Sequence, residues 1–183
     1  MRPESCVHDI HDNEYRRGGI VENNTEILAF IEIPRGSRNK YEYDHVNHTF
    51  RLDRVLYSSV HYPADYGFIP ETLGLDGDPL DILVLVQEPT FPGCLVPARP
   101  VGGLDMRDAK GSDFKVVAVP VGDPRYAHVD DLAAVGDHWA REIETFFATY
   151  KLLEDKTTEV LGWHDAAEAR TVIEECRERF RGY

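Results

Sequence analysis

Five aspartates fall in two short segments, and each segment runs directly into an apolar stretch. The first segment contains Asp76, Asp78 and Asp81, and the second contains Asp108 and Asp113 with the spacing of Asp76 and Asp81. Carboxylates this close repel one another unless solvent or cations neutralise them, and divalent cations such as Mg²⁺ prefer oxygen ligands. The two segments therefore predict a site at which carboxylates hold divalent metal ions.

Two alternatives compete with this interpretation of the first acidic segment. An EF-hand calcium loop fails on spacing, because Asp81 stands where the loop needs glycine and Gln87 stands where it needs a bidentate glutamate. The residues after Asp81 are also β-branched and apolar, which predicts a strand and not the helix that leaves an EF-hand. A solvated acidic turn is the other alternative, and the second segment with matching spacing argues against it.

Basic, phenolic and acidic residues elsewhere are candidates for holding an anion beside such metals. Lys40 and Glu42 share one face of a predicted strand, because side chains alternate along a strand. Each of these residues alone is typical of a solvated surface, so the argument depends on the set. The set comprises Glu32, Lys40, Glu42, Arg54, Lys115, Tyr150 and Lys151.

The overall charge limits the classes of partner. The chain has 183 residues, a net charge of −13 and a pI near 5.0, which oppose binding to nucleic acid and to anionic membranes. No stretch is long enough for a membrane span, and no signal-peptide pattern follows Met1. Cys6, Cys94 and Cys176 are widely separated and lack zinc-binding spacing, so we expect reduced thiols in a cytoplasmic protein.

The patterning predicts one domain of mainly β structure with flanking helices (α+β). Strands are expected near 27–33, 40–43 and 50–56, and short β-branched runs between prolines and glycines predict a meandering, closed sheet. Helices are expected at about 137–153, with Asp137 as N-cap, and at about 166–180, with a capping box from Asp165 to Glu168. We therefore predict a polar arm over residues 1–24 and a single domain over 25–183. The expected domain is a closed five-stranded OB-like barrel with two C-terminal helices.

Several blocks of the chain resemble the family I soluble inorganic pyrophosphatases of bacterial type. The acidic segment from Asp76 to Asp81 is similar to that family's signature, Asp-x-Asp-Pro-x-Asp followed by an apolar strand. Other blocks agree with the family in order and approximate spacing. They are residues 31–34, 40–42, 53–54, 62–67, 99–102, 108–115 and 146–151.

The resemblance implies a role for each candidate residue. The expected metal ligands are Asp76, Asp81 and Asp113 for the first Mg²⁺, with Asp81 shared by a second, and Asp108 and Glu32 for metals that arrive with substrate. The expected phosphate-binding residues are Lys40, Arg54, Lys115, Tyr150 and Lys151. Glu42, Asp53 and Tyr62 are expected to line the cavity, Tyr66 to lie near the nucleophile, and Asp78 to be the general base. The resemblance also implies a homohexamer.

The expected activity is therefore Mg²⁺-dependent hydrolysis of pyrophosphate to two phosphates, with Mn²⁺ as a possible substitute. A water or hydroxide activated by metal would attack phosphorus directly in line, and Asp78 would accept its proton. The alternatives are a barrel that binds oligonucleotides, a domain stabilised by calcium and a phosphohydrolase with another substrate such as ATP. The acidic charge opposes the first and the failed EF-hand spacing opposes the second.

Overall fold

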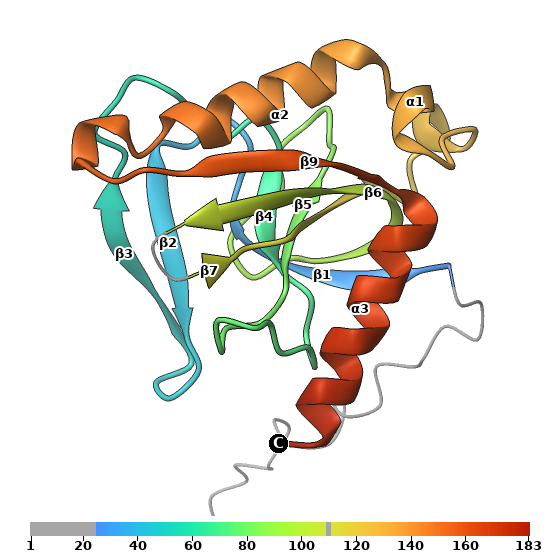
Figure 1. The fold of residues 1–183 in the computed structure, drawn as a ribbon, viewed down its shortest axis with the longest axis horizontal. Helices are drawn as coiled ribbons and strands as arrows, with labels where there is room; N and C mark the ends of the chain where they lie inside the picture. Colours follow the sequence, from blue (N-terminus) through green and yellow to red (C-terminus); the bar gives the residue numbers. More distant parts are fainter. Residues whose placement is uncertain (1–24, 109–110) are drawn as a thin grey trace, which may run out of the picture.

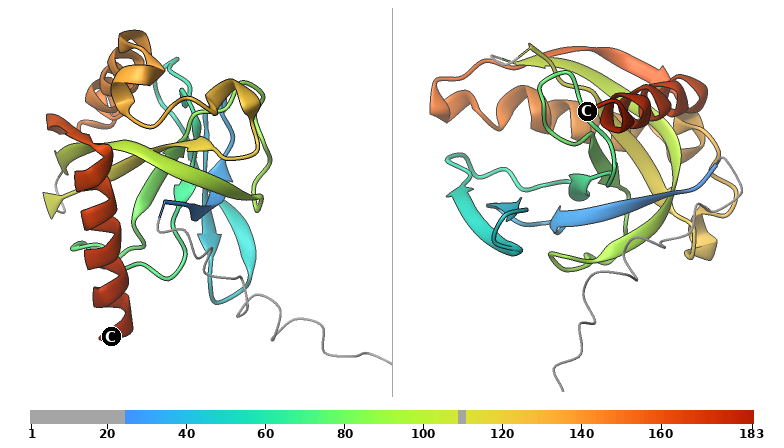
Figure 2. Two further views of the ribbon diagram at one scale, coloured as in Figure 1. Left: turned by 90° about the vertical axis from the view of Figure 1, so that its right-hand side faces the viewer. Right: turned by 90° about the horizontal axis from the view of Figure 1, so that it is seen from below.

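The structure, a computed structural model, describes residues 25–108 and 111–183, and these form two sheets with helices packed outside them (Figures 1 and 2). The predicted arm of residues 1–24 and Cys6 lie outside the described residues. The larger sheet has seven strands and the smaller has two. The predicted mainly β fold with a C-terminal helix is confirmed.

The larger sheet runs β1–β4–β5–β8–β6–β7, and β1 also pairs with β6. All of its pairs are antiparallel except β5 with β8. The bounds are β1 (Ile27–Ile33), β4 (Asp65–Phe68), β5 (Asp81–Val84), β6 (Leu95–Asp108), β7 (Gly111–Ser112) and β8 (Lys115–Pro120). The expected meander is wrong at this point, because β8 lies between β5 and β6.

The parallel pairing of β5 with β8 brings the two acidic segments together. Asp81 is the first residue of β5 and pairs in register with Lys115, the first residue of β8. Parallel neighbours begin at the same edge of a sheet, whereas antiparallel neighbours begin at opposite edges. The segments that precede the two strands therefore meet at one edge.

The smaller sheet is a hairpin of β2 (Asn39–Asp44) and β3 (Thr49–Val55). Lys40 and Arg54 are register partners in this hairpin, which places two of the predicted anion-binding residues side by side. Glu32 links the hairpin to the larger sheet, because its Oε1 atom accepts a hydrogen bond of 2.7 Å from the Tyr43 backbone N–H.

The predicted helices are present with changed limits. They are α2 (Asp137–Thr149) and α3 (Ala166–Arg181), whereas α1 (Leu132–Val135) and two 3₁₀ turns (Pro124–Tyr126 and Leu152–Glu154) were not predicted. Asp137 is not the N-cap of α2, because Gly136, with φ of 99°, holds that position. The capping box of α3 is confirmed, with Asp165 accepting from the Glu168 N–H and the Glu168 side chain accepting in return. Strand β9 (Glu159–Asp165), which pairs with β6, was not predicted.

The helices cover two hydrophobic clusters on opposite faces of the central strands. Ile82 packs in the cluster that includes Ile173 of α3, and Leu83 packs in the cluster that includes Phe147 of α2. This alternation is the period-two pattern of a strand buried on both faces. Gly67 shows how closely β4 approaches β1, since a Cβ atom there would lie 1.9 Å from the Phe30 carbonyl oxygen.

Candidate active site

Lys115 lies at the point where the two acidic segments meet. Its side chain is only 2% exposed, and its Nζ atom lies 2.6 Å from Asp81 Oδ2 and 2.8 Å from Asp113 Oδ1. Burial alone would lower the pKa of the Lys115 ammonium, but the charges of Asp81 and Asp113 outweigh burial and raise it. The lysine therefore stays charged and bridges the two segments.

Tyr66 of β4 donates a hydrogen bond of 2.5 Å from its hydroxyl to Asp81 Oδ2. The Lys115 Nζ atom lies 3.3 Å from the same hydroxyl. Burial, followed by the charges of Asp81 and Asp113, raises the pKa of the Tyr66 phenol well above its ordinary value. The phenol therefore remains protonated and acts as a donor towards the carboxylates.

Asp76 and Asp78 lie on the turn that precedes β5, where Gly77 adopts a positive φ of 88°. Asp78 donates its backbone N–H to Asp76 Oδ1 at 3.2 Å. Burial raises the pKa of the Asp76 carboxyl, and the negative charges of Asp78, Asp81 and Asp113 raise it further. The hydrogen bond from the Asp78 N–H acts in the opposite direction and lowers this pKa. These four aspartates thus share one electrostatic environment.

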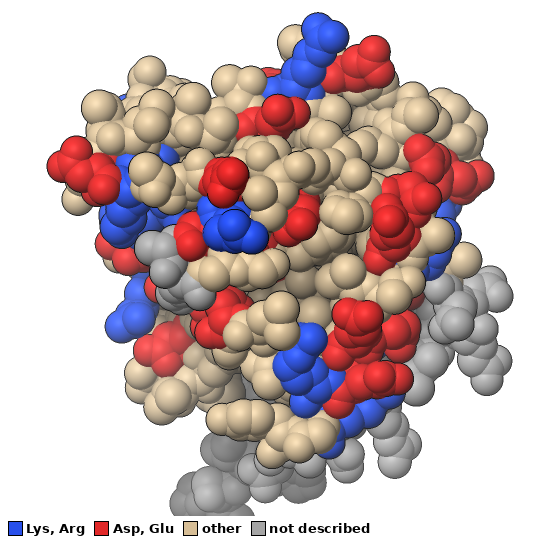
Figure 3. All heavy atoms as spheres, viewed as in Figure 1, with Lys and Arg blue, Asp and Glu red and all other residues tan. Residues whose placement is uncertain are grey.

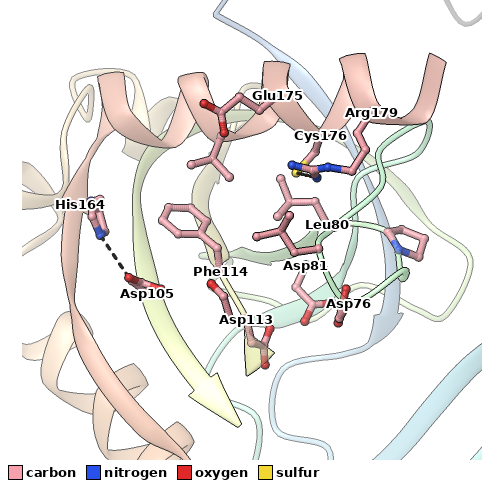
Figure 4. A pocket seen from close by; sticks show the side chains of 15 residues that line it. Asp76, Leu80, Asp81, Asp105, Asp113, Phe114, His164, Glu175, Cys176 and Arg179 are labelled. Atoms are coloured by element: carbon pink, nitrogen blue, oxygen red, sulfur yellow. Dashed lines mark hydrogen bonds and ion pairs between the residues drawn. The ribbon is translucent and has the colours of Figure 1, made fainter. Parts of the chain in front are cut away.

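A pocket of about 250 Å³ opens beside the acidic turn. Asp76, Asp81 and Asp113 converge at one end, and Cys176 and Arg179 of α3 lie at the other (Figure 4). Within residues 25–108 and 111–183, no group of three or more Asp, Glu, His and Cys side chains is already arranged around one metal position. The Lys115 ammonium, which is not among the lining residues, supplies the positive charge between Asp81 and Asp113.

The predicted cationic residues of the hairpin form a second set of ion pairs. Lys40 pairs with Glu42 and lies 3.6 Å from Asp53, which also pairs with Arg54. Arg54 Nε donates to Glu154 Oε1 at 2.9 Å, and the Glu154 side chain is only 4% exposed. Glu154 was not among the site residues predicted from the sequence.

Glu32 has the most unusual acid–base property of the predicted acids. Burial raises the pKa of its carboxyl to about 7; the charges of Asp81 and Glu42 act in the same direction, while the Tyr43 N–H and Lys40 oppose the rise. A carboxyl that titrates near neutral pH changes its charge readily when a cation approaches. Glu32 therefore interacts both with Asp81 of the first acidic segment and with Lys40 and Glu42 of the hairpin.

An aromatic wall connects the remaining predicted residues. The Tyr62 ring lies 5.3 Å from that of Tyr66 and 4.8 Å from that of Phe146, which in turn lies 5.2 Å from the Tyr150 ring. Burial, and then Tyr150 and Asp81, raises the pKa of the Tyr62 phenol well above its ordinary value. These ring contacts, two tilted and one stacked, hold the aromatic side chains in fixed positions beside the acidic residues.

The last predicted pair lies next to this wall. Lys151 follows Tyr150, and its Nζ atom lies 5.1 Å from the Tyr150 ring centroid and 3.0 Å from Asp108 Oδ2. The structure thus brings all the predicted site residues into one network of hydrogen bonds, ion pairs, ring contacts and electrostatic interactions. Acidic and basic side chains intermingle on the face drawn in Figure 3, without a broad basic patch.

Residues 29–181 match the family described as inorganic pyrophosphatase. The chain belongs to the inorganic pyrophosphatase family. An inorganic pyrophosphatase from Methanosarcina mazei is 53% identical over 152 residues, which cover 83% of this chain and 90% of that protein. One from Halalkalibacterium halodurans is 53% identical over 156 residues, which cover 85% and 96%. The crystal structure of the pyrophosphatase from Thermus thermophilus has a TM-score of 0.84 at 46% identity and covers 86% of this chain and 92% of its own.

Other features of this pyrophosphatase-family chain were not predicted. Asp65, next to Tyr66, is fully buried and accepts hydrogen bonds from the Arg35 N–H at 2.7 Å and from the Thr90 N–H and hydroxyl at 3.0 and 2.7 Å. It therefore links the loop after Glu32 to the strand that carries Tyr66.

In the described part of the chain, no helix is long and apolar enough to cross a membrane.

Proposed function

We propose that this member of the family hydrolyses inorganic pyrophosphate to two phosphates in a Mg²⁺-dependent reaction. The observation that carries the proposal is the parallel register of Asp81 with Lys115, which joins both acidic segments at one edge. The identity of 53% to curated inorganic pyrophosphatases over most of the chain supports the same substrate. Pyrophosphate is highly charged, so an acidic protein needs metal ions or buried cations to bind it.

The carboxylates fit Mg²⁺ by their donor chemistry. Carboxylate oxygens are the ligands that Mg²⁺ prefers, and the position between Asp81 and Asp113 already accepts a cation, the Lys115 ammonium. Lys115 contacts Asp81 Oδ2 and Asp113 Oδ1, and each carboxylate has a second oxygen able to accept. We propose Asp76, Asp81 and Asp113 as ligands of the first ion, with Glu32 and Asp108 contributing to further ions and Mn²⁺ as a substitute. When bound, such ions neutralise phosphate charge and acidify water.

The cationic and phenolic residues would hold the substrate. Cations compensate the charge of phosphoryl oxygens, and neutral phenols donate hydrogen bonds without adding charge. The raised pKa of the Tyr62 phenol keeps it protonated, whereas the single O–H of Tyr66 is already donated to Asp81. The proposed phosphate-binding residues are Lys40, Arg54, Lys115, Tyr150 and Lys151, and Glu42, Asp53 and Tyr62 would line the substrate cavity.

Asp78 is the proposed general base for an attacking water that approaches phosphorus in line. It lies on the exposed part of the acidic turn, adjacent to Asp76, where a carboxylate is accessible to water. A base in this position removes the proton as the new bond to phosphorus forms. Tyr66, which donates to Asp81, would fix the ligand beside the nucleophile.

We also propose the architecture and setting expected for such an enzyme. The pairings β1–β4–β5–β8–β6 return to β1, which supports a closed five-stranded OB-like barrel within a single domain over residues 25–183. The free thiols of Cys94 and Cys176 support a cytoplasmic location. A homohexamer and the absence of a nucleic-acid partner complete the proposal, the latter because of the net charge of −13.

Phosphate release from purified protein tests the proposal. We expect hydrolysis of pyrophosphate with Mg²⁺, loss of hydrolysis with EDTA and little release from ATP under the same conditions. If phosphate were released from ATP as fast as from pyrophosphate, the protein would be a phosphohydrolase of another specificity on the same fold. Absence of release from pyrophosphate at any Mg²⁺ concentration would refute the proposed function.

A further inference from the structure

The acidic turn projects into solvent between two buried residues. Thr72 is 2% exposed and Leu80 is 5% exposed, whereas Leu75 between them is 74% exposed. The Leu80 N–H donates to the Thr72 hydroxyl at 2.9 Å, and the Gly74 N–H donates to the Asp78 carbonyl at 2.7 Å. These local bonds shape the turn, but its direction relative to β8 depends on what holds its first residues.

Helix α3 holds the turn through both polar backbone groups of Leu73. The Leu73 N–H donates to the Cys176 carbonyl at 3.0 Å, and Arg179 Nη1 donates to the Leu73 carbonyl. The same Nη1 atom lies 3.5 Å from Cys176 Sγ, and Cys176 is only 4% exposed. Two bonds to one residue restrain both its position and its orientation.

The Arg179 guanidinium shares the pocket with the carboxylates of Asp76, Asp81 and Asp113 (Figure 4). It lies on the last turn of α3 and contacts Leu73, which is 106 positions away in the sequence. The pocket therefore includes a residue, Arg179, that belongs to neither acidic segment and holds Leu73 just before the first of them.

We propose that Arg179 is a positioning residue that holds the acidic turn in the orientation needed for metal binding. This inference rests on the proposed role of Asp76 and Asp81 as Mg²⁺ ligands. A turn that is already ordered loses less conformational entropy when its carboxylates bind an ion, so the restraint raises metal affinity. The restraint acts before substrate arrives, and its effect is therefore measurable without turnover.

Two effects of Arg179 on Mg²⁺ binding have opposite signs. As a restraint on Leu73, the side chain favours binding, and its removal weakens binding. As a positive charge near three carboxylates, it repels Mg²⁺, and its removal strengthens binding. The direction of the change in affinity therefore distinguishes a positioning role from a simple electrostatic one.

The test is calorimetric titration of Mg²⁺ into the full-length Arg179→Gln protein without substrate. We expect the dissociation constant to rise by about 3- to 10-fold, the loss of roughly one hydrogen bond. Turnover of pyrophosphate should fall at subsaturating Mg²⁺ and recover as Mg²⁺ approaches saturation, because the bound ion then holds the turn. Arg181→Gln, at an exposed position of the same helix, is the matched control and should leave the constant unchanged.

Amide hydrogen exchange and a conservative variant guard against a trivial loss of folding. Arg179→Gln should speed exchange at Gly74 and Gly77 while the amides of β5 keep their protection. Arg179→Lys retains a donor and should recover part of the affinity for Mg²⁺. If Arg179→Gln does not fold, the Mg²⁺ dissociation constants of Arg179→Lys and its control Arg181→Lys are compared instead, and only that of Arg179→Lys should rise. An unchanged or tighter Mg²⁺ constant in the folded variant would overturn the proposal. If the unsubstituted protein itself bound no Mg²⁺, the proposed function would fail and this inference with it.

Discussion

Replacing Lys115 with methionine tests whether a buried cation joins the two acidic segments. Methionine keeps the length and apolar packing of the lysine stem but removes the charge between Asp81 and Asp113. In the absence of Mg²⁺, the two carboxylates would then repel each other without compensation. We expect Lys115→Met to be destabilised at neutral pH in EDTA.

The magnitude follows from the burial of the three groups. Removing one partner of a fully buried ion pair costs about 3–5 kcal/mol, because the other partner keeps its charge without compensation. Asp81 and Asp113 are 30% and 18% exposed, so water screens part of that cost. We expect a loss of about 2–3 kcal/mol, equivalent to a fall of roughly 5–10 °C in the unfolding temperature.

Thermal and urea unfolding in EDTA at pH 7.5 measure this cost. The loss should shrink when Mg²⁺ is added, because the ion compensates the two carboxylates and binds only the folded protein. Lys156→Met is the control, because Lys156 is 56% exposed and pairs with Glu154 at 3.5 Å; it should cost less than about 1 kcal/mol. If Lys115→Met unfolded at pH 7.5 in EDTA like the unsubstituted protein, the bridging role of Lys115 would be wrong.

Three further predictions follow from the site and the sheet. The pKa of Glu32 rises on folding from 4.5 to about 7, so its ionisation opposes folding as pH rises through that window. Glu32→Gln should therefore match the unsubstituted protein at pH 4 in EDTA and exceed its stability at pH 8 by about 1–2 kcal/mol. This is less than the roughly 3 kcal/mol that the full shift represents, because Glu32 is only partly buried. Equal stabilities at pH 8 would contradict this. Gly67→Ala forces a Cβ atom to within 1.9 Å of the Phe30 oxygen and should cost roughly 2–3 kcal/mol in urea unfolding, whereas Gly122→Ala, with nothing within 4 Å, should cost little. Hydrolysis at saturating Mg²⁺ should fall below pH 7, because the raised pKa values of Glu32 and Asp76 favour protonation of proposed ligands; a flat rate from pH 5 to 9 would argue otherwise.

Local patterns predicted the parts of the fold that depend on neighbouring residues. The capping box at Asp165, the strand near residues 27–33 and the helix near residues 137–153 all follow from patterns within one element. The gathering of the acidic segments was also predicted, because like charges with matching spacing imply a shared cation. The spacing gave no reason, however, for the parallel pairing of β5 with β8 that brings them together.

The features that escaped prediction depend on contacts between distant residues. Strand β9 contains a glycine and a mixed burial pattern, and it is fixed by pairing with β6. Glu154 reads as an ordinary surface acid until Arg54, 100 positions away, lies beside it. The proposed role of Arg179 likewise depends on its hydrogen bond to the Leu73 carbonyl. Their residue types carry no signal of these partners, and only the folded chain supplies one.

The division of the acids into metal ligands and one base is tested most directly by turnover of Asp78→Asn at saturating Mg²⁺. We predict that pyrophosphate hydrolysis slows by about 10²-fold or more, while calorimetry shows Mg²⁺ binding close to that of the unsubstituted protein. Asp130→Asn, at a side chain that is 82% exposed, provides the control and should hydrolyse pyrophosphate normally. Near-normal turnover of Asp78→Asn would contradict the assignment of the base, and loss of Mg²⁺ binding would place Asp78 among the ligands instead.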